Sequence, residues 1–357
     1  MAKTTKTTFI DLFAGIGGFH FALEKQGAEC VYASEWDKEC RKVYEENFKK
    51  YSPNIFNLYP NSSENLSDDE AFFSQKLFSG DITKVDPKTI PNHDVLCAGF
   101  PCQPFSISGK QKGFSDTRGT LFFNVLEIIN TKQPKVVFLE NVKHLVHHDG
   151  GNTLKVILKS LNDAGYKTSW KVLNAKDFGT AQNRERIIII GNKDKQFDFS
   201  KLTIKKPKSI RDILDKTGDF EILKPEDYTI LPKELWKRQD SGLIFCGYRN
   251  KAIRKAGVRL GTEHLSRVHK QPNRIYHIDG THPTLPSQET SGRFWIYDNN
   301  IVRKLTIDEC YKLQGFPKSF KKSAILGSCY KQIGNSVAIP MIEEVYKQIK
   351  EQYGIWP

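Results

Sequence analysis

Residues 8–18 read TFIDLFAGIGG, and this stretch decides the fold class. Its first six residues are apolar or β-branched apart from one aspartate, which is typical of a strand, and its glycine-rich end is typical of a turn. A helical pattern of apolar residues follows as far as Gly27. A strand, a glycine-rich turn and a helix open the nucleotide-binding α/β folds. Because His20 stands where the third glycine of a G-x-G-x-x-G motif would be, a pyrophosphate is a less suitable ligand for this turn than another group that approaches the backbone closely.

Strand and helix patterns alternate through the first 193 residues. Strands are expected at 29–34, 94–98, 135–139, 166–173 and 187–190, with helices at 37–48, 120–129 and 154–164. This alternation predicts an α/β fold with a doubly wound, mostly parallel sheet. After Asn192 the pattern fades into a Lys-, Arg-, Pro- and Gly-rich region, and helices are predicted again at 305–314 and 339–352. We therefore expect a discontinuous domain of residues 1–193 plus 305–357 and a second, smaller domain of residues 194–304.

The composition favours a polyanionic partner. The 357 residues include 54 Lys and Arg against 41 Asp and Glu, a formal net charge of +13, which favours nucleic acid first and an anionic membrane surface second. No stretch of about 18 apolar residues and no apolar leader is present, so neither a membrane span nor a secretory signal is expected. The seven cysteines have neither paired nor zinc-ligand spacing, which predicts free thiols, a cytoplasmic location and no metal site.

Cys102 is the candidate nucleophile. It lies in the sequence GFPCQPFS at 99–106, directly after the apolar run 94–98, where glycine and prolines exclude a helix. The residue is therefore expected on a loop at the carboxyl end of a strand, where open α/β sheets bind ligands. Glu140, Arg184 and Arg186 are expected at other strand ends of the same sheet. A thiolate, a proton-donating carboxyl and cations suit covalent attack on an electron-poor ring, whereas a loop cysteine without a role is the alternative.

Two acidic residues are candidates for binding a nucleoside. Glu35 ends the second predicted strand, where a carboxylate can accept hydrogen bonds from two ribose hydroxyls, and Trp36 beside it can stack on adenine. The alternative is a charged strand cap next to a packed indole. Asp81 follows a later apolar run and can accept a hydrogen bond from an adenine amino group.

Seven motifs occur in an order that resembles the DNA (cytosine-5) methyltransferases of the bacterial restriction-modification type. They are FAGIGG at 13–18, GFPCQ at 99–103, ENV at 140–142, QNRER at 182–186, RKLT at 303–306, LQGFP at 313–317 and GNSV at 334–337. The resemblance implies the fold of the S-adenosylmethionine-dependent methyltransferases and methyl transfer to C5 of a flipped-out cytosine. It assigns Cys102 to attack on C6, Glu140 to N3 and the exocyclic amine, and Arg186 to O2, with Arg184 in the same motif. Cofactor-binding roles fall on Phe13, Gly15, Gly17, Glu35, Trp36, Asp81, Ile82, Pro101, Asn335 and Val337, and no metal is required.

The resemblance also implies the partners. Residues 194–304 occupy the place of the target-recognition domain, which differs from member to member, and double-stranded DNA is the expected substrate. A monomer is expected, with a cognate restriction endonuclease that acts separately. The candidates for contacting bases and phosphates are Arg249, Arg254, Arg259, Arg267, Lys270, Gln271, Asn273 and Arg274.

Residues 49–75 form a longer insertion than the compact bacterial enzymes usually carry.

Two alternatives remain beside a DNA methyltransferase. One is an RNA cytosine-5 methyltransferase of the same fold, against which the long basic region argues. The other is a catalytically inactive regulator that binds DNA and cofactor, against which the intact Cys102, Glu140 and Arg186 argue.

Overall fold

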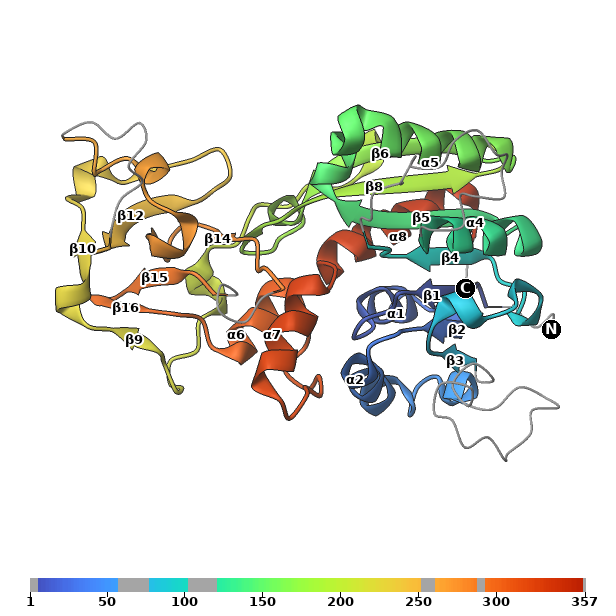
Figure 1. Cartoon of the computed structure of the whole chain (residues 1–357), viewed down its shortest axis with the longest axis horizontal. Coiled ribbons are helices and arrows are strands. Elements are labelled where there is room, and N and C mark those ends of the chain that lie inside the picture. The colour runs from blue at the N-terminus through green and yellow to red at the C-terminus, as the bar shows by residue number, and fades with distance from the viewer. Residues whose placement is uncertain (1–5, 57–76, 102–120, 252–260, 288–292, 356–357) are drawn as a thin grey trace, which may run out of the picture. The chain divides into compact units, whose positions relative to one another are not determined.

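The computed structural model describes residues 6–56, 77–101, 121–251, 261–287 and 293–355. The chain divides into two compact units (Figure 1). Unit 1 comprises Met1–Leu173, Glu185–Thr203 and Ile342–Pro357, and unit 2 comprises Asn174–Arg184 and Ile204–Met341.

Unit 1 is built on a seven-stranded sheet in the order β3-β2-β1-β4-β5-β8-β6 (Figure 1). The first five strands of this order pair in parallel, and β8 pairs with β5 in antiparallel orientation. The strands are β1 Thr8–Leu12, β2 Glu29–Ser34, β3 Phe78–Ser79, β4 Val95–Ala98, β5 Val136–Val142, β6 Lys167–Asn174 and β8 Glu185–Asn192. The helices are α1 Gly18–Glu24, α2 Lys38–Phe48, α4 Leu121–Lys132 and α5 Asn152–Asp163, and α8 Ile339–Tyr353 joins them from the end of the chain.

Helices cover both faces of this sheet. Since side chains alternate along a strand, Ile10 and Leu12 of β1 enter one core cluster, which includes Val125 of α4 and Ile157 of α5. The opposite face of β1 packs on α1, where the rings of Phe9 and His20 lie 5.5 Å apart at their centroids. The predicted doubly wound, mostly parallel α/β fold is therefore confirmed.

The C-terminal helix α8 returns to the first βα unit. The ammonium of Lys25 forms a 2.8 Å ion pair with Glu343, and the side-chain amide of Gln26 donates to the Glu343 carbonyl at 2.7 Å. One turn before the helix ends, Lys350 donates to the Gln26 carbonyl at 3.1 Å. The end of the chain thereby fastens the turn between α1 and β2.

The described part of unit 2 contains short strands, short 3-10 helices and the α-helices α6 and α7. Its larger sheet has the order β10-β12-β13-β15-β16-β9, with β11 paired to β12, and β14 pairs separately with β7 in parallel. The strands are β7 Gln182–Asn183, β9 Ile222–Leu223, β10 Tyr228–Ile230, β11 Lys237–Arg238, β12 Ile244–Arg249, β13 Arg274–His277, β14 His282–Pro283, β15 Trp295–Asp298 and β16 Ile301–Arg303. The helices are α6 Ile307–Gln314 and α7 Leu326–Asn335. Thr306 and Glu309 form a capping box at the N-terminus of α6.

The compact units differ in their bounds from the expected domains. Residues 174–184 and 305–341 lie in unit 2, although the expected catalytic domain, 1–193 plus 305–357, includes them, and residues 194–203 lie in unit 1, although the expected second domain, 194–304, includes them. The reason is a set of buried hydrogen bonds that join Gln182 and Arg184 to Leu285 and join Gln314 to the end of α7. The roles of the two parts, catalysis and target recognition, stay a prediction.

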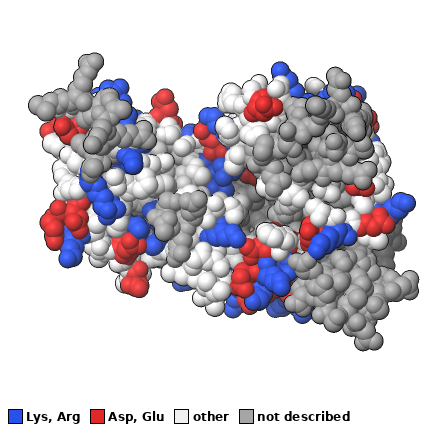
Figure 2. Space-filling model, viewed as in Figure 1, with Lys and Arg blue, Asp and Glu red and all other residues white. Residues whose placement is uncertain are grey.

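Basic and acidic side chains are interspersed on the described surface in the view of Figure 2. Among the described residues of this face, the Lys and Arg side chains therefore do not form one continuous basic patch. Within the described ranges, no helix is long and apolar enough to cross a membrane.

Candidate active site

The carboxyl ends of the central strands of unit 1 lie in register. Leu12 pairs with Ser34 and with Ala98, and Ala98 pairs in turn with Leu139. Ser34 also pairs with Ser79 at the end of β3. The segments that follow these strands therefore begin at one edge of the sheet, and the motifs expected to carry the chemistry of unit 1 start there.

The glycine turn after β1 is tied to the acid after β2. The Gly15 amide donates to Glu35 Oε2 at 2.7 Å, and the Asp37 amide donates to Glu35 Oε1 at the same distance. Burial raises the pKa of Glu35, and the two amides oppose this shift. Phe13, Gly15 and Gly17 all have positive φ. Gly15 is half-buried and a Cβ there would meet nothing within 4 Å, so a ligand can approach the backbone at this residue, whereas Gly17 packs on the Phe48 ring. Each carboxylate oxygen of Glu35 retains a lone pair for a further donor.

Trp36 presents its indole to solvent, with 73% of the residue exposed. The backbone of Trp36 is fixed by Arg41, whose guanidinium donates to the carbonyls of Glu35 and Trp36 at 2.8 and 2.7 Å. Asp81 follows β3 and caps a short 3-10 helix, Ile82–Lys84, through Oδ1, which accepts from Thr83. The predicted ribose and adenine residues of unit 1 thus follow neighbouring strands, with a free aromatic face beside the acid.

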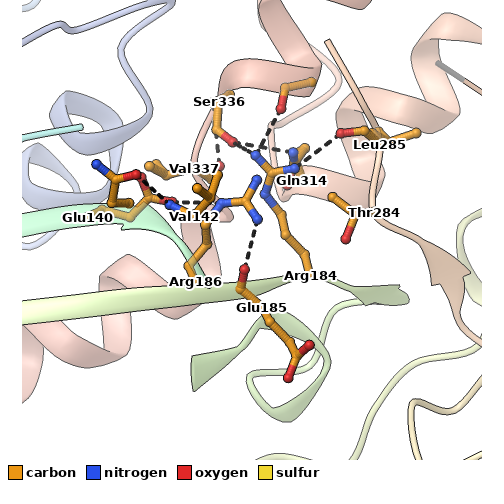
Figure 3. Close-up of polar contacts among 12 residues, drawn as sticks. Glu140, Val142, Arg184, Glu185, Arg186, Thr284, Leu285, Gln314, Ser336 and Val337 are labelled. Carbon is orange, nitrogen blue, oxygen red and sulfur yellow. Dashed lines mark hydrogen bonds and ion pairs between the residues drawn. The ribbon is translucent and has the colours of Figure 1, made fainter. Parts of the chain in front are cut away.

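Glu140 and Arg186 form an ion pair across β5 and β8, with Arg186 Nε 3.0 Å from Glu140 Oε1 (Figure 3). Both side chains are nearly buried, at 10% and 11% exposed. The antiparallel register places Arg186 opposite Val142, two residues beyond Glu140. Burial lowers the pKa of Arg186, and the Glu140 carboxylate opposes this shift. A carboxyl and a guanidinium are therefore held side by side at the predicted site.

The strand that leads to the candidate nucleophile ends beside this pair. A Cβ on Gly99 would lie 3.8 Å from Glu140 Oε2, so the backbone after β4 passes next to the carboxyl. Cys102 itself, two residues after the described Phe100, lies outside the described residues. Pro101 is described and exposed.

Asn141 is a site residue that the motif-by-motif reading did not single out. Its side-chain amide donates to the Phe100 carbonyl at 2.8 Å, and its Oδ1 accepts from the Val142 amide at 2.8 Å. The side chain is buried, and both hydrogen bonds fix its orientation. Asn141 therefore ties the backbone two residues before Cys102 to the strand that carries Glu140. Its place in the ENV motif, directly after Glu140, was the available signal.

Arg184 lies in unit 2 and is almost fully buried. Its guanidinium donates to the carbonyls of Leu285, Gly334 and Ser336, at 3.3, 2.9 and 2.7 Å (Figure 3). Gly334 and Ser336 flank Asn335, which is exposed, and precede Val337, which is buried. The predicted catalytic arginine thus has its donors directed at backbone, next to two predicted cofactor residues.

Asp11 and His20 form a buried polar pair that sequence reasoning did not assign. The Asp11 carboxyl on β1 accepts from the His20 amide in the first turn of α1 at 3.2 Å. Burial raises the pKa of Asp11 to about 8, the His20 amide lowers it and Glu35 raises it further. The His20 ring stacks on Phe48 at 4.0 Å and hydrogen-bonds to the Tyr44 hydroxyl. His20, which stands in place of the third glycine of a G-x-G-x-x-G motif, is therefore part of the core.

The recognition candidates in unit 2 separate into packed and exposed residues. His269 is buried, stacks on Tyr248 at 4.1 Å and bonds through Nε2 to the Glu263 carbonyl. Arg274 Nε donates to the His269 carbonyl at 3.0 Å, and the Arg249 guanidinium lies 5.4 Å from the Trp295 ring centre.

The exposed candidates are Arg267, Lys270 and Gln271, with Asn273 half-buried. Arg254 and Arg259 lie outside the described residues, as does most of the 49–75 insertion. Among the residues that the structure describes, no group of three or more His, Cys, Asp or Glu side chains could hold a metal ion.

Comparisons with known proteins agree with the motifs. The sequence model of C-5 cytosine-specific DNA methylases matches residues 7–73 and 70–351. The chain is 39% identical over 364 residues to the type II methyltransferase M.HhaI of Haemophilus parahaemolyticus, which covers 99% of this chain and 98% of that protein. It is also 39% identical over 366 residues to M.HpaII of Haemophilus parainfluenzae, with 98% and 90% covered.

Two solved structures share the fold. The DNMT2 of Spodoptera frugiperda has a TM-score of 0.63 at 18% identity, covering 96% of this chain and 99% of that one. The Dnmt2 methyltransferase of S. pombe has a TM-score of 0.63 at 17% identity, covering 98% and 99%. The predicted methyltransferase fold and the resemblance are confirmed: the chain belongs to the family of C-5 cytosine-specific DNA methylases and is a DNA cytosine-5-methyltransferase.

Proposed function

We propose that this enzyme transfers a methyl group from S-adenosylmethionine to C5 of a cytosine in double-stranded DNA, through a covalent bond between Cys102 and C6. The observation that supports this most is the Glu140–Arg186 pair, which lies beside Gly99 where the chain leaves β4 toward Cys102. A carboxyl and a guanidinium side by side match the N3, amino and O2 edge of cytosine.

The chemistry begins at the thiolate of Cys102. Its Sγ forms a bond to C6, and the electrons of the C5=C6 bond move to C5 while Glu140 hydrogen-bonds or protonates N3 and Arg186 holds O2. C5 then takes the methyl carbon, whose bond to sulfur breaks and leaves S-adenosylhomocysteine. A base removes the C5 proton, the C5=C6 bond forms again, and the Sγ–C6 bond breaks to return the thiolate.

The residues around the glycine turn suit a nucleoside cofactor. S-adenosylmethionine supplies an electrophilic methyl group on a sulfonium. The Glu35 carboxylate, oriented by two amides, has lone pairs for ribose hydroxyls, and the exposed Trp36 ring can stack on adenine. The proposed cofactor residues are Phe13, Gly15, Gly17, Glu35, Trp36, Asp81, Ile82, Pro101, Asn335 and Val337.

The target cytosine must leave the DNA stack, because C6 is not accessible to a thiol inside a duplex. Sequence choice falls to the proposed recognition domain, residues 194–304. Among the described residues, we favour Arg267, Lys270 and Gln271 for contacting DNA. They are exposed on a segment that the buried His269 anchors. Arg267→Ala is expected to relax one position of the methylated motif, at about 1–3 kcal/mol of lost discrimination.

Expression in a host whose DNA lacks 5-methylcytosine tests the proposal. Base-resolution mapping of 5-methylcytosine should show modification within one short motif for the natural enzyme and none for Cys102→Ser. Modification confined to RNA supports the RNA methyltransferase instead. Binding of DNA and S-adenosylhomocysteine without any methylation supports the inactive regulator.

A further inference from the structure

We propose that Arg184 is a positioning residue that sets the cofactor affinity by holding the backbone of residues 334–336 against the 282–287 segment, together with Gln182 and Gln314. The inference rests on the proposed function, in which Asn335 and Val337 contact the cofactor. All the contacts that carry it lie within unit 2.

Arg184 hydrogen-bonds to both the 282–287 segment and the backbone of residues 334–336. One terminal nitrogen donates to the Leu285 carbonyl at 3.3 Å, and the other donates to the Gly334 and Ser336 carbonyls at 2.9 and 2.7 Å (Figure 3). The two carbonyls on the far side belong to the residues on either side of Asn335. One planar fork thus fixes the peptide groups before and after a proposed cofactor residue.

Two buried glutamines complete the same junction. Gln182 Oε1 accepts from the Leu285 amide at 3.0 Å, so both polar backbone groups of Leu285 are bound by the QNRER motif. Gln182 Nε2 donates to Gln314 Oε1 at 3.2 Å, and Gln314 Nε2 donates to the Ile333 carbonyl at 3.0 Å. Side chains of the QNRER and LQGFP motifs therefore join these two motifs to each other and to the GNSV motif. In the sequence the three motifs are far apart.

The backbone on either side of this junction is in close contact. A Cβ on Gly334 would lie 2.2 Å from the Pro286 carbonyl oxygen and 2.7 Å from Ser287 Cα, so residue 334 must be glycine for the segments to meet. The 282–287 segment is fixed on its other side, because β14 pairs with β7 and the Thr284 hydroxyl donates to the Asn183 carbonyl at 2.7 Å. The end of α7, where the GNSV motif begins, is thus held against the 282–287 segment.

The chemistry of the side chain explains why arginine occupies this position. A buried guanidinium stabilises a structure through the groups that accept from it, and here its two terminal nitrogens donate to the backbone carbonyls of Leu285, Gly334 and Ser336. A lysine carries the same charge but lacks the planar fork, so it cannot hold three carbonyls in the same geometry. Arg184→Lys therefore releases the GNSV backbone while keeping the charge.

The test compares Arg184→Lys with Arg303→Lys as the matched control. Arg303 is also fully buried in unit 2, where its guanidinium bonds to Asp298, Glu309 and the Lys304 carbonyl rather than to residues 334–336. For each full-length enzyme, calorimetry measures the Kd of S-adenosylhomocysteine, steady-state assays measure kcat and the KM for each substrate, and thermal unfolding measures Tm. Gln314→Met removes the neutral donors to the same backbone at similar volume.

Arg184→Lys should raise the cofactor Kd and KM by about tenfold, while kcat at saturating cofactor and the KM for DNA change by less than about threefold. Gln314→Met should weaken cofactor binding in the same way, and it decides the question if Arg184→Lys does not fold. Arg303→Lys should lower Tm without changing the cofactor Kd.

An unchanged cofactor Kd in Arg184→Lys overturns the inference and leaves the proposed function standing. An equal loss in Arg303→Lys overturns it too, because the effect would then be general destabilisation. Failure of the natural enzyme to bind S-adenosylhomocysteine overturns the proposed function and this inference with it.

Discussion

Asp11→Asn should remove a pH-dependent part of the free energy of unfolding. The carboxyl of Asp11 is fully buried on β1, and its pKa is raised from 3.8 to about 8. The native state therefore binds a proton that the unfolded chain has lost over the range between these values. Its contribution to stability is fully present below about pH 4 and is lost as the pH rises toward about 8.

The magnitude follows from the proton count. One pKa unit is worth about 1.4 kcal/mol, so lowering the pH from about 8 to about 6 should stabilise the natural protein by about 2 kcal/mol relative to Asp11→Asn. Asparagine keeps an oxygen that can accept from the His20 amide and carries no charge at any pH. Urea unfolding at three pH values in this range measures the difference directly.

Asp94→Asn is the matched control of opposite sign. Burial alone would raise the pKa of Asp94, but Lys135 and the Thr8 amide outweigh it and lower the pKa. Its stabilising contribution is present above the unfolded pKa of about 4 and is lost only as the pH falls below that value, so its difference from the natural protein should be constant between about pH 6 and about pH 8. Parallel stability curves for the natural protein and Asp11→Asn over this range would refute the assignment of a neutral carboxyl at Asp11.

Three further perturbations test local parts of the account. Gly17→Ala places a methyl carbon 2.2 Å from a ring carbon of Phe48 at a φ of 85°, whereas Gly15→Ala meets nothing within 4 Å, so urea unfolding should show a loss of about 1 kcal/mol for Gly15→Ala and a larger one for Gly17→Ala. Asn141→Ala should lower kcat by about tenfold with an unchanged Kd for S-adenosylhomocysteine, and an unchanged kcat would contradict its role beside the nucleophile. Lys270→Ala should weaken binding to all DNA sequences alike and lower the salt slope by about one, which binding isotherms at several salt concentrations check.

Local patterns predicted the elements of unit 1 well, because each strand and helix there has its own signal. The strand expected at 29–34 has these bounds in the structure, and the helix expected at 37–48 begins after Asp37, whose side chain caps it. The sequence predicted only that Glu140 and Arg186 lie at strand ends of one sheet; their ion pair depends on the antiparallel pairing of β5 with β8, which the sequence did not predict.

The parts that sequence reasoning could not supply depend on contacts between distant segments. Nothing in the sequence around Arg184 distinguishes a guanidinium that binds backbone carbonyls 101 to 152 residues away from one that faces a ligand. Long-range hydrogen bonds of this kind also join residues 174–184 and 305–341 to the rest of unit 2, which the sequence did not predict. The pKa of Asp11 likewise arises from burial between β1 and α1, which a short window of sequence does not reveal.

Covalent trapping is the measurement that tests the central claim most directly. A duplex with 5-fluorocytosine at the mapped target position is incubated with the enzyme and S-adenosylmethionine, and the products are separated under denaturing conditions. Fluorine at C5 cannot leave as the proton does, so the bond from Cys102 to C6 should persist, and mass spectrometry should find one methylated nucleotide attached to the peptide that contains Cys102. Cys102→Ser should give no adduct, although it binds the same duplex. An adduct at another residue, or full methylation by Cys102→Ser, would contradict covalent catalysis by Cys102.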